Sequence, residues 1–332
     1  MLNQKNMSKK LDVRGSIKTV LDVLRKAKSV LLTSHIRPEG DSIGSQLAMA
    51  SFLKHIGKKV WIVNEDPVPF NYRFLPYWRT IKNKLPQDAN FDTLLVVDSS
   101  NLFRIGNVES YITGNIRVVN IDHHISNDNF GIYWINPCAS STGEMIWELL
   151  KTVKFPITIK EVKYLYTAII TDTGGLRFVN TTERSFTTVA EMLKCGLKQD
   201  EVLSFIYEKN PFSKIKLLGL SLSTLSSTQD GKIVWFWVTQ EMLKKSGACL
   251  EETEDFINQA RSINSAKVAI FFGEETDGKT KISFRSKGRI NVNKIAQKFG
   301  GGGHNAASGC TVKGNPQQVQ EKVIEYVKNM VK

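Results

Sequence analysis

The chain has 332 residues, of which 41% are hydrophobic and 23% charged, and its formal net charge is +13 at pH 7. This length exceeds the usual size of a single core, so two domains are expected, and the composition excludes a largely disordered protein. The positive charge suits an anionic partner or substrate, although lysines on solvated helix faces explain it equally well.

Four further classes of protein are disfavoured. The longest apolar stretches, such as residues 232–238, are far shorter than the roughly 20 residues that cross a bilayer. The N-terminus is polar and has no signal-peptide core, so a cytoplasmic protein is expected. The sequence has no run of five or more basic residues, so a basic tail that binds duplex DNA is not supported. The four cysteines lack paired spacing, which predicts partly buried free thiols rather than structural zinc or disulfides.

The first half of the chain alternates short apolar runs with segments of helical periodicity. The expected strands are residues 29–35, 58–64, 92–100 and 116–124, and the expected helices are residues 41–57, 141–153 and 158–174. Such alternation is typical of an α/β fold with a doubly wound, mostly parallel sheet. In such sheets, ligands bind at the carboxyl ends of the strands.

Residues 181–227 have a largely helical pattern, and the pattern changes beyond them. Strands are expected at 231–240, 266–275 and 278–288, with helices at 252–263 and 291–300. We therefore expect a second, smaller α/β domain and place the boundary near residue 190, inside the helical region.

Four polar clusters lie where the expected strands or helices end. They are His35, Glu39 and Asp41 after the first strand, Asp98 after a later strand, Asp122, His123 and His124 after the next strand, and Asp172 at a helix end. Each has an ordinary structural explanation when taken alone, such as a turn former or a helix cap. In a parallel sheet, however, the strand-end groups share one edge and can converge.

The chemistry of these side chains suits divalent metal ions. Carboxylates with a minority of imidazoles favour Mn²⁺ or Mg²⁺, sometimes iron or cobalt, over structural zinc. Six candidate ligands are too many for one ion but suit two ions, roughly 3.5–4 Å apart, that share a carboxylate and activate water against a phosphoryl group. We expect His123 to bind metal, His124 to face the substrate as an acid or hydrogen-bond donor, and Asp122 to orient an imidazole.

A second cluster lies in residues 285–309. Four consecutive glycines at 300–303 expose backbone N–H groups, which suits close approach to phosphate or ribose. His304 follows at once, and Arg285 lies in the strand before. A glycine-rich turn alone is weak evidence, but together with these neighbours it favours a ligand site.

The segments HIRPEGDSIGS, LVVDSS, NIDHH, TDTGGLRFVNTT and FGGGGHNAASG together resemble the motif set of the DHH/DHHA1 phosphoesterases. Within that superfamily, the length and order resemble enzymes that degrade very short RNA (nanoRNase) and remove the 3′-phosphate of pAp. With the boundary near residue 190 and a connecting segment to about 214, the resemblance implies a DHH catalytic metal-binding domain at 1–190, a helical linker at 191–214 and a DHHA1 substrate-binding domain at 215–332. The active site would lie in the cleft between the domains, and a homodimer is plausible on this ground alone.

The resemblance also implies a site with two manganese ions, with Mg²⁺ or Co²⁺ as alternatives. His35, Glu39 and Asp98 would hold one ion, and Asp41, Asp98, His123 and Asp172 the other, with Asp98 bridging and His124 beside the substrate phosphate. The implied substrate-binding residues of the second domain are Arg285, Ser286, Gly301, Gly302, Gly303 and His304. Arg104 and Arg177 are further candidates for phosphate contact, although either can equally pair with a structural carboxylate.

One residue departs from the family pattern H-x-x-P-D-x-D, because Glu39 stands where the family usually has aspartate. Glutamate keeps the charge and lengthens the side chain by one methylene. We expect it to coordinate with a shifted backbone or altered denticity, or to leave the first metal more weakly held.

Other functions remain open at the level of sequence. A stand-alone phosphodiesterase for pApA or c-di-AMP is the nearest, since it uses the same motifs. Inorganic pyrophosphatases of the superfamily lack the glycine-run and histidine pattern, and the single-strand DNA exonucleases usually have extra domains. From a different class, a non-catalytic single-stranded RNA binder would need aromatic platforms, yet Trp235, Phe236 and Trp237 lie in an expected core strand.

Overall fold

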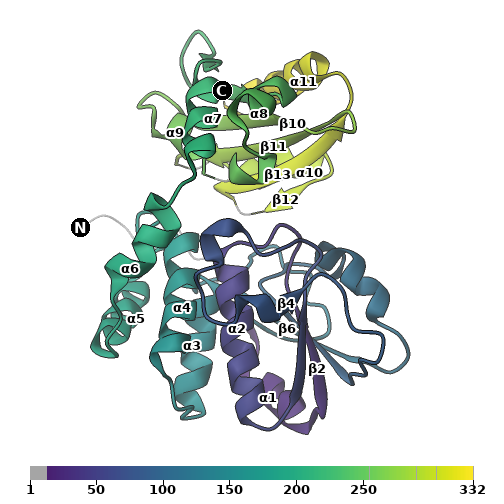
Figure 1. The fold of residues 1–332 in the computed structure, drawn as a ribbon. Coiled ribbons are helices and arrows are strands. Elements are labelled where there is room, and N and C mark those ends of the chain that lie inside the picture. Colours follow the sequence, from purple (N-terminus) through teal and green to yellow (C-terminus); the bar gives the residue numbers. More distant parts are fainter. Residues whose placement is uncertain (1–12, 254, 289, 304, 332) are drawn as a thin grey trace, which may run out of the picture. The chain divides into compact units, whose positions relative to one another are not determined.

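A computed structural model describes residues 13–253, 255–288, 290–303 and 305–331. The chain divides into two compact units, Met1–Lys209 and Asn210–Lys332 (Figure 1). The division falls inside the stretch that the sequence predicts to be helical. The assignment of residues 191–214 as a linker remains a prediction.

The first unit is built on a seven-stranded sheet with the strand order β1-β7-β6-β5-β2-β3-β4. The strands are β1 (Arg14–Gly15), β2 (Ser29–Thr33), β3 (Lys59–Val63), β4 (Ile81–Lys82), β5 (Thr93–Val97), β6 (Arg117–Asp122) and β7 (Ile132–Ile135). All neighbours are parallel except β1 and β7, which confirms the predicted α/β fold. From β2 the chain moves outward through β3 and β4, then returns to β5, so the order reverses between β2 and β5. Ligands in open parallel sheets bind at the carboxyl ends of the strands at such a reversal.

Helices cover both faces of this sheet. The α-helices are α1 (Ile17–Lys26), α2 (Gly40–His55), α3 (Thr142–Thr152), α4 (Ile159–Asp172), α5 (Glu183–Lys194) and α6 (Gln199–Leu203). Helical turns of other types are η2 (Phe70–Tyr72), η3 (Trp78–Thr80), η4 (Leu102–Tyr111) and η5 (Ser204–Glu208). Along β5, Leu95 and Val97 join the core beneath α1 to α5, while Leu94 and Val96 join a second core that includes η4. Because both faces are buried, the strand is continuously apolar from Leu94 to Val97 rather than alternating.

Glycines allow α2 and α3 to pack closely against α4 (Figure 1). A Cβ atom at Gly44 would lie 2.2 Å from the carbonyl oxygen of Tyr164, and one at Gly40 would lie 2.4 Å from Oγ1 of Thr171. A Cβ atom at Gly143 of α3 would likewise lie 2.3 Å from that of Ala168. This packing sets the N-terminal ends of α2 and α3 beside the C-terminal end of α4.

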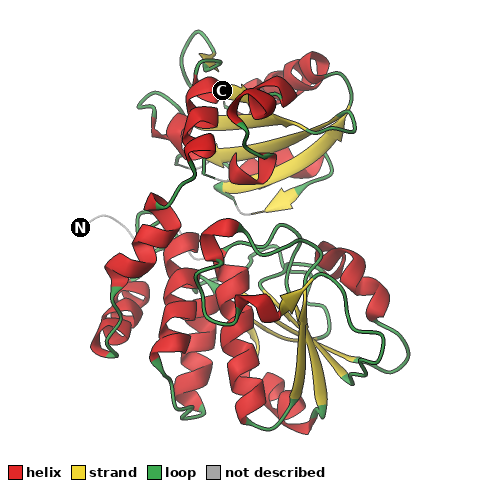
Figure 2. Cartoon of the chain, viewed as in Figure 1, coloured by secondary structure: helices red, strands yellow, loops and turns green. Residues whose placement is uncertain are grey.

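The second unit has a six-stranded sheet with the order β12-β13-β11-β10-β9-β8. Its strands are β8 (Ser226–Ser227), β9 (Ile233–Val238), β10 (Val268–Glu274), β11 (Lys279–Ser286), β12 (Gly302–Gly303) and β13 (Ala307–Lys313). Its helices are α7 (Phe212–Leu222), α8 (Gln240–Ser246), α9 (Ile257–Ser262), α10 (Val292–Lys298) and α11 (Pro316–Met330), with the turn η6 (Leu250–Thr253). Strands β9 and β10 are parallel and the other neighbours are antiparallel. Alternate residues of β10 belong to two different apolar clusters, one shared with α10 and α11 and the other with α7 and α9. Figure 2 shows the helices and the sheet of this unit.

Most of the expected elements are present, and the structure adds others that the sequence analysis does not predict. The main additions are α1, β7, β13 and α11. Phe236 is buried in β9, as expected for a core strand. The prediction of partly buried thiols is wrong for Cys138, Cys195 and Cys249, which are exposed, and only Cys310 of the four is buried. Within the described part of the chain, none of the helices has the length and apolar character needed to span a membrane.

Candidate metal centre

The clusters predicted from the sequence of the first unit converge at one edge of its sheet. His35 follows β2, Asp98 follows β5, and His123 follows β6. Glu39 is the N-cap of α2 and Asp41 lies in its first turn, while Asp172 is the last residue of α4. The parallel order of the strands therefore brings the strand-end groups together, and the α2–α4 packing adds the helix residues.

Asp98 lies at the centre of the cluster. Its backbone is left-handed, with φ of 57°, so the chain turns sharply as it leaves β5. One carboxylate oxygen, Oδ2, lies 3.5 Å from Nε2 of His35, and the other, Oδ1, lies 3.7 Å from Nε2 of His123. Burial by itself would raise the pKa of Asp98, but the hydrogen bond and charge of His35 and the charges of the other two histidines lower it below its usual value. The two carboxylate oxygens of Asp98 therefore face two different histidines.

Asp41 is completely buried and is held by the first turn of α3. Its Oδ2 accepts a hydrogen bond from the N–H of Thr142 at 2.7 Å, and its Oδ1 accepts one from the N–H of Gly143 at 2.8 Å. Even so, burial and the nearby charges of Asp98 and Asp172 raise the pKa of Asp41 well above its usual range. Three carboxylates gathered in a buried space repel one another, and a bound cation would relieve that repulsion.

His123 faces all three of these aspartates. Its Nε2 lies 3.7 Å from Oδ1 of Asp98, 3.7 Å from Oδ2 of Asp172 and 3.8 Å from Oδ2 of Asp41. Its Nδ1 lies 3.3 Å from the carbonyl oxygen of Ala139. A proton on Nδ1 is directed at that oxygen and leaves the Nε2 lone pair facing the carboxylates, as in histidines that bind metals.

The possible ligand atoms form two groups among the described residues. Asp98, His123 and His124 make one group, and His35, Glu39 and Asp98 make the other, with the ligand atoms of each group within 4.8 Å of one another. Both groups contain Asp98. Oxygen and imidazole ligands of this kind fit a hard or borderline divalent ion.

His124 is oriented by Asp122, as the sequence analysis expects of that carboxylate. The Nδ1 of His124 lies 2.6 Å from Oδ1 of Asp122, whose Oδ2 accepts a hydrogen bond from Nδ2 of Asn127 at 2.6 Å. Burial would raise the pKa of Asp122, but the charge and hydrogen bond of His124 lower it. Asp122 therefore remains ionised beside the ring and holds it at Nδ1.

Several supporting residues were missed by the sequence analysis. Ser42 lies between two proposed ligands, with its Oγ 3.0 Å from Nε2 of His35 and donating to Oδ2 of Asp98 at 2.6 Å. Asn180 donates from Nδ2 to Oδ2 of Asp172 at 2.9 Å. Both residues lie in the quoted motifs, but nothing in their type or spacing revealed these partners.

The two predicted phosphate-binding arginines of the first unit form hydrogen bonds with backbone groups of that unit. Arg177 is exposed, and its Nε donates to the carbonyl oxygen of Gly174 at 2.6 Å. Arg104 lies in η4 and is half-buried, and its carbonyl oxygen accepts a hydrogen bond from the N–H of Ile36 at 2.7 Å. Arg104 thus ties η4 to the loop that carries His35.

The candidate substrate residues of the second unit lie near the ends of β11 and β12. Nη1 of Arg285 donates to the carbonyl oxygen of Phe284 at 3.1 Å, and Oγ of Ser286 donates to that of Ile290 at 2.7 Å. His304 lies outside the described residues.

Two glycines of the 300–303 run are explained by strand packing. A Cβ atom at Gly301 would lie 2.1 Å from the carbonyl oxygen of Gly309, and one at Gly303 would lie 2.6 Å from that of Ala307. Gly300 and Gly302 have open faces: a Cβ atom at Gly300 would meet no described atom within 4 Å, and one at Gly302 would lie 3.9 Å from Oδ1 of Asn293. Contact with β13 therefore requires glycine at 301 and 303 whether or not a ligand binds.

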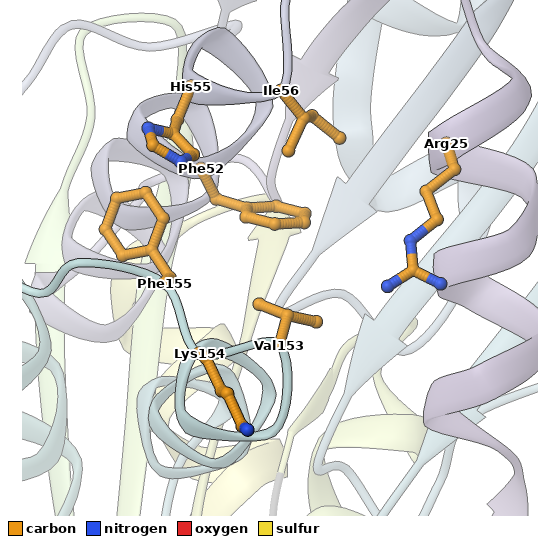
Figure 3. Close-up of a pocket in the computed structure, with 7 residues that line it drawn as sticks. All are labelled: Arg25, Phe52, His55, Ile56, Val153, Lys154 and Phe155. Atoms are coloured by element: carbon orange, nitrogen blue, oxygen red, sulfur yellow. The ribbon is translucent and has the colours of Figure 1, made fainter.

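A separate cavity of about 130 Å³ lies where α1, α2 and α3 end (Figure 3). It is lined by Arg25, Phe52, His55, Ile56, Val153, Lys154 and Phe155. Its cationic side chains lie at helix C-termini, where positive charge stabilises the helix dipole. Because α2 and α3 start at the metal cluster and end at this cavity, the two features lie at opposite ends of the same helices.

Comparison with known families gives two matches along the chain. The model for the DHH family, N-terminal domain, matches residues 29–169, and the model for the DHHA1 domain matches residues 225–332. The two matches leave the connecting region and the first 28 residues outside.

Relatives from several bacteria carry the name bifunctional oligoribonuclease and PAP phosphatase NrnA. The one from Thermus thermophilus is 34% identical over 318 residues, covering 94% of this chain and 93% of the relative. The one from Bacillus subtilis is 30% identical over 290 residues, covering 86% of this chain and 89% of the relative.

Crystal structures of other proteins also resemble this chain. An exopolyphosphatase-related protein from Bacteroides fragilis is 27% identical, with a TM-score of 0.85 over 95% of this chain and 97% of that protein. RecJ from Thermus thermophilus, in complex with Mn²⁺, is 11% identical, with a TM-score of 0.53 over 94% of this chain and 54% of that protein. The RecJ comparison concerns the fold alone.

Proposed function

This chain belongs to the DHH phosphoesterase family and carries a DHHA1 domain, and from that membership we propose that it uses two divalent metal ions to hydrolyse very short RNA and the 3′-phosphate of pAp. Its class is that of a metal-dependent phosphoesterase, hence a hydrolase. The proposed substrates are those in the names of its relatives. The observation that carries the proposal is the convergence of three aspartates on Nε2 of His123.

We propose the ligands in two sets. His35, Glu39 and Asp98 hold one ion, and we name this set the first position. Asp41, Asp98, His123 and Asp172 hold the other ion, and we name this set the second position. The group of ligand atoms from His35, Glu39 and Asp98 supports the first set. The convergence of three aspartates on Nε2 of His123, and the repulsion that raises the pKa of Asp41, support the second. The excess of oxygen ligands favours Mn²⁺, with Mg²⁺ and Co²⁺ as alternatives.

The ions, when bound, supply Lewis-acid stabilisation of the phosphoryl oxygens and a water activated for attack. The side chains of the protein hold the ligands in position and provide one proton donor. His124 is held at Nδ1 by Asp122, so we propose that its Nε2 donates a proton or hydrogen bond to the phosphate or to the leaving oxygen. Asp122, kept ionised, stabilises the charged form of the ring.

We propose further contacts for the rest of the substrate. Arg104 and Arg177 are candidates for phosphate contact from the first unit. From the second unit, the candidates are Arg285, Ser286, Gly301, Gly302, Gly303 and His304. The net charge of +13 would raise the local concentration of such anionic substrates.

A substrate panel tests the proposal. With Mn²⁺ present, the protein should hydrolyse pAp and RNA of two to five nucleotides, and turnover should stop when a chelator removes the metal. Faster turnover of pApA or c-di-AMP than of pAp and short RNA would instead favour the stand-alone phosphodiesterase. Binding of RNA without hydrolysis, at any Mn²⁺ concentration, would favour the non-catalytic binder.

Glu39 supplies a sharper test of the first position. Its side chain does not cap α2, although it occupies the N-cap, so the carboxylate is available to the ion. Glu39→Gln keeps the length and removes the charge. We expect Mn²⁺ at the first position to bind at least about 10-fold more weakly, since even residues outside the ligand shell contribute 10- to 100-fold.

In equilibrium dialysis with Mn²⁺, the number of ions bound per chain should fall from two toward one. Glu65→Gln is a suitable control, because Glu65 follows the neighbouring strand β3 and accepts a hydrogen bond from the N–H of Asn107 at 2.7 Å. The control should bind two ions. Equal binding by the two variants would remove Glu39 from the ligand set.

A further inference from the structure

We propose that residues 139–143 form a frame that positions the ligands of the second position, and that Asn180 and Glu144 hold this frame in place. The inference rests on the proposed function, since it concerns the affinity for one of the two ions. Asn180 and Glu144 are positioning residues and are not proposed as ligands themselves.

The last two residues of the frame hold two ligands. The N–H groups of Thr142 and Gly143 bind the two carboxylate oxygens of Asp41, one to each oxygen. The Oγ1 of Thr142 donates to Oδ1 of Asp98 at 3.3 Å. Because the donors belong to the first turn of α3, the carboxylate of Asp41 also gains from the positive end of the helix.

The first two residues of the frame reach the other two ligands. The carbonyl oxygen of Ala139 lies 3.3 Å from Nδ1 of His123. The carbonyl oxygen of Ser140 accepts a hydrogen bond from Nδ2 of Asn180 at 2.9 Å, and the same Nδ2 donates to Oδ2 of Asp172 at 2.9 Å. Through these contacts, the frame reaches all four ligands of the second position.

Glu144 links the frame to helix α5. It is completely buried, and its Oε2 accepts hydrogen bonds from Oγ of Ser140 at 2.5 Å and from Oγ of Ser185 at 3.1 Å. Its Oε1 pairs with Nε of Arg184 at 3.1 Å. Since Ser185 and Arg184 belong to α5, Glu144 anchors the frame to that helix.

The first position is held from a different direction. His35 contacts Oγ of Ser42, at 3.0 Å from its Nε2, and its Nδ1 lies 2.7 Å from the carbonyl oxygen of Ile36. These supports come from α2 and from the loop after β2. Loosening the frame should therefore weaken the second position much more than it weakens His35 and Glu39.

The test is a calorimetric titration of metal-free protein with Mn²⁺. Asn180→Ala removes the donor shared by Ser140 and Asp172, and Glu144→Gln removes the anchor charge without touching a ligand. Each should weaken one of the two binding steps by about 10- to 100-fold and leave the other within about 3-fold, as expected for residues that orient metal ligands. Ser42→Ala should weaken the step that these two variants spare.

The control is Asn83→Ala, in which the lost Nδ2 donates to the carbonyl oxygens of Asn64 and Glu65, both at 3.2 Å. It removes a similar bridge between loops that carry no proposed ligand, and it should leave both steps unchanged. Equal weakening of both steps, or of neither, in Asn180→Ala and Glu144→Gln would overturn the frame. If the unmodified protein binds no Mn²⁺, the proposed function itself fails, so the two failures are distinguishable.

Discussion

Asp98→Asn should lower turnover of pAp and short RNA by about 10³-fold or more, equivalent to roughly 4 kcal/mol of transition-state stabilisation. Asp98 is the residue common to both groups of ligand atoms, so its loss weakens both metal positions. Asparagine has nearly the same shape and tolerates the left-handed backbone at this position, where φ is 57°. The fold should therefore survive while the bound Mn²⁺ falls below two ions, as dialysis and turnover would measure.

The matched control lies at the other end of the same strand. Asp92 precedes β5 and accepts hydrogen bonds from the N–H of Lys28 at 2.9 Å and from Oγ1 of Thr93 at 2.8 Å. Asp92→Asn should retain two ions and near-normal turnover. Asp98→Asn with full turnover and two bound ions would contradict the bridging assignment.

The sequence predicted the strand-end part of the site because the rule behind it is local. Apolar runs predict buried parallel strands, and parallel strands bring the residues after them to one edge. Asp98 and His123 follow adjacent strands, and His35 follows the strand on the other side of Asp98. The positions of these three residues could therefore be predicted without knowing how the helices pack.

Asp172 was named as a candidate from the sequence, but its position beside His123 depends on tertiary packing. It ends α4, and it approaches His123 only because the glycines of α2 admit that helix. Similarly, the N–H groups that bind Asp41 come from residues more than a hundred positions away. Periodicity carries no information about such contacts, which is why the frame and Asn180 were missed.

The glycine run shows a different limit of the sequence. Glycine serves equally where a ligand approaches the backbone and where another strand does. At 301 and 303, the structure has the second reason, because β12 lies against β13. Since β13 was not predicted, the sequence offered only the first reason.

Gly44→Ala should be among the most destabilising single substitutions in the first unit. The added Cβ would lie 2.2 Å from the carbonyl oxygen of Tyr164, and this atom belongs to the backbone of α4 rather than to a flexible side chain. The two helices must then separate, and overpacking of this kind typically costs about 1–3 kcal/mol and occasionally more. Thermal unfolding of the metal-free protein should show the loss as a lower midpoint.

Gly219→Ala separates this effect from the general effect of replacing a helical glycine. Gly219 lies within α7 and is exposed, and a Cβ there would meet no atom within 4 Å in the described structure. That substitution should be neutral or stabilising by up to about 1 kcal/mol, because alanine favours the helix.

Stabilisation by added Mn²⁺ should also fall in Gly44→Ala and stay normal in Gly219→Ala. Gly44 is not a proposed ligand. A loss of metal binding in Gly44→Ala alone would therefore show that the α2–α4 contact brings Asp41 and Asp172 to a common ion. Equal stabilisation of the two variants by Mn²⁺ would show that it does not.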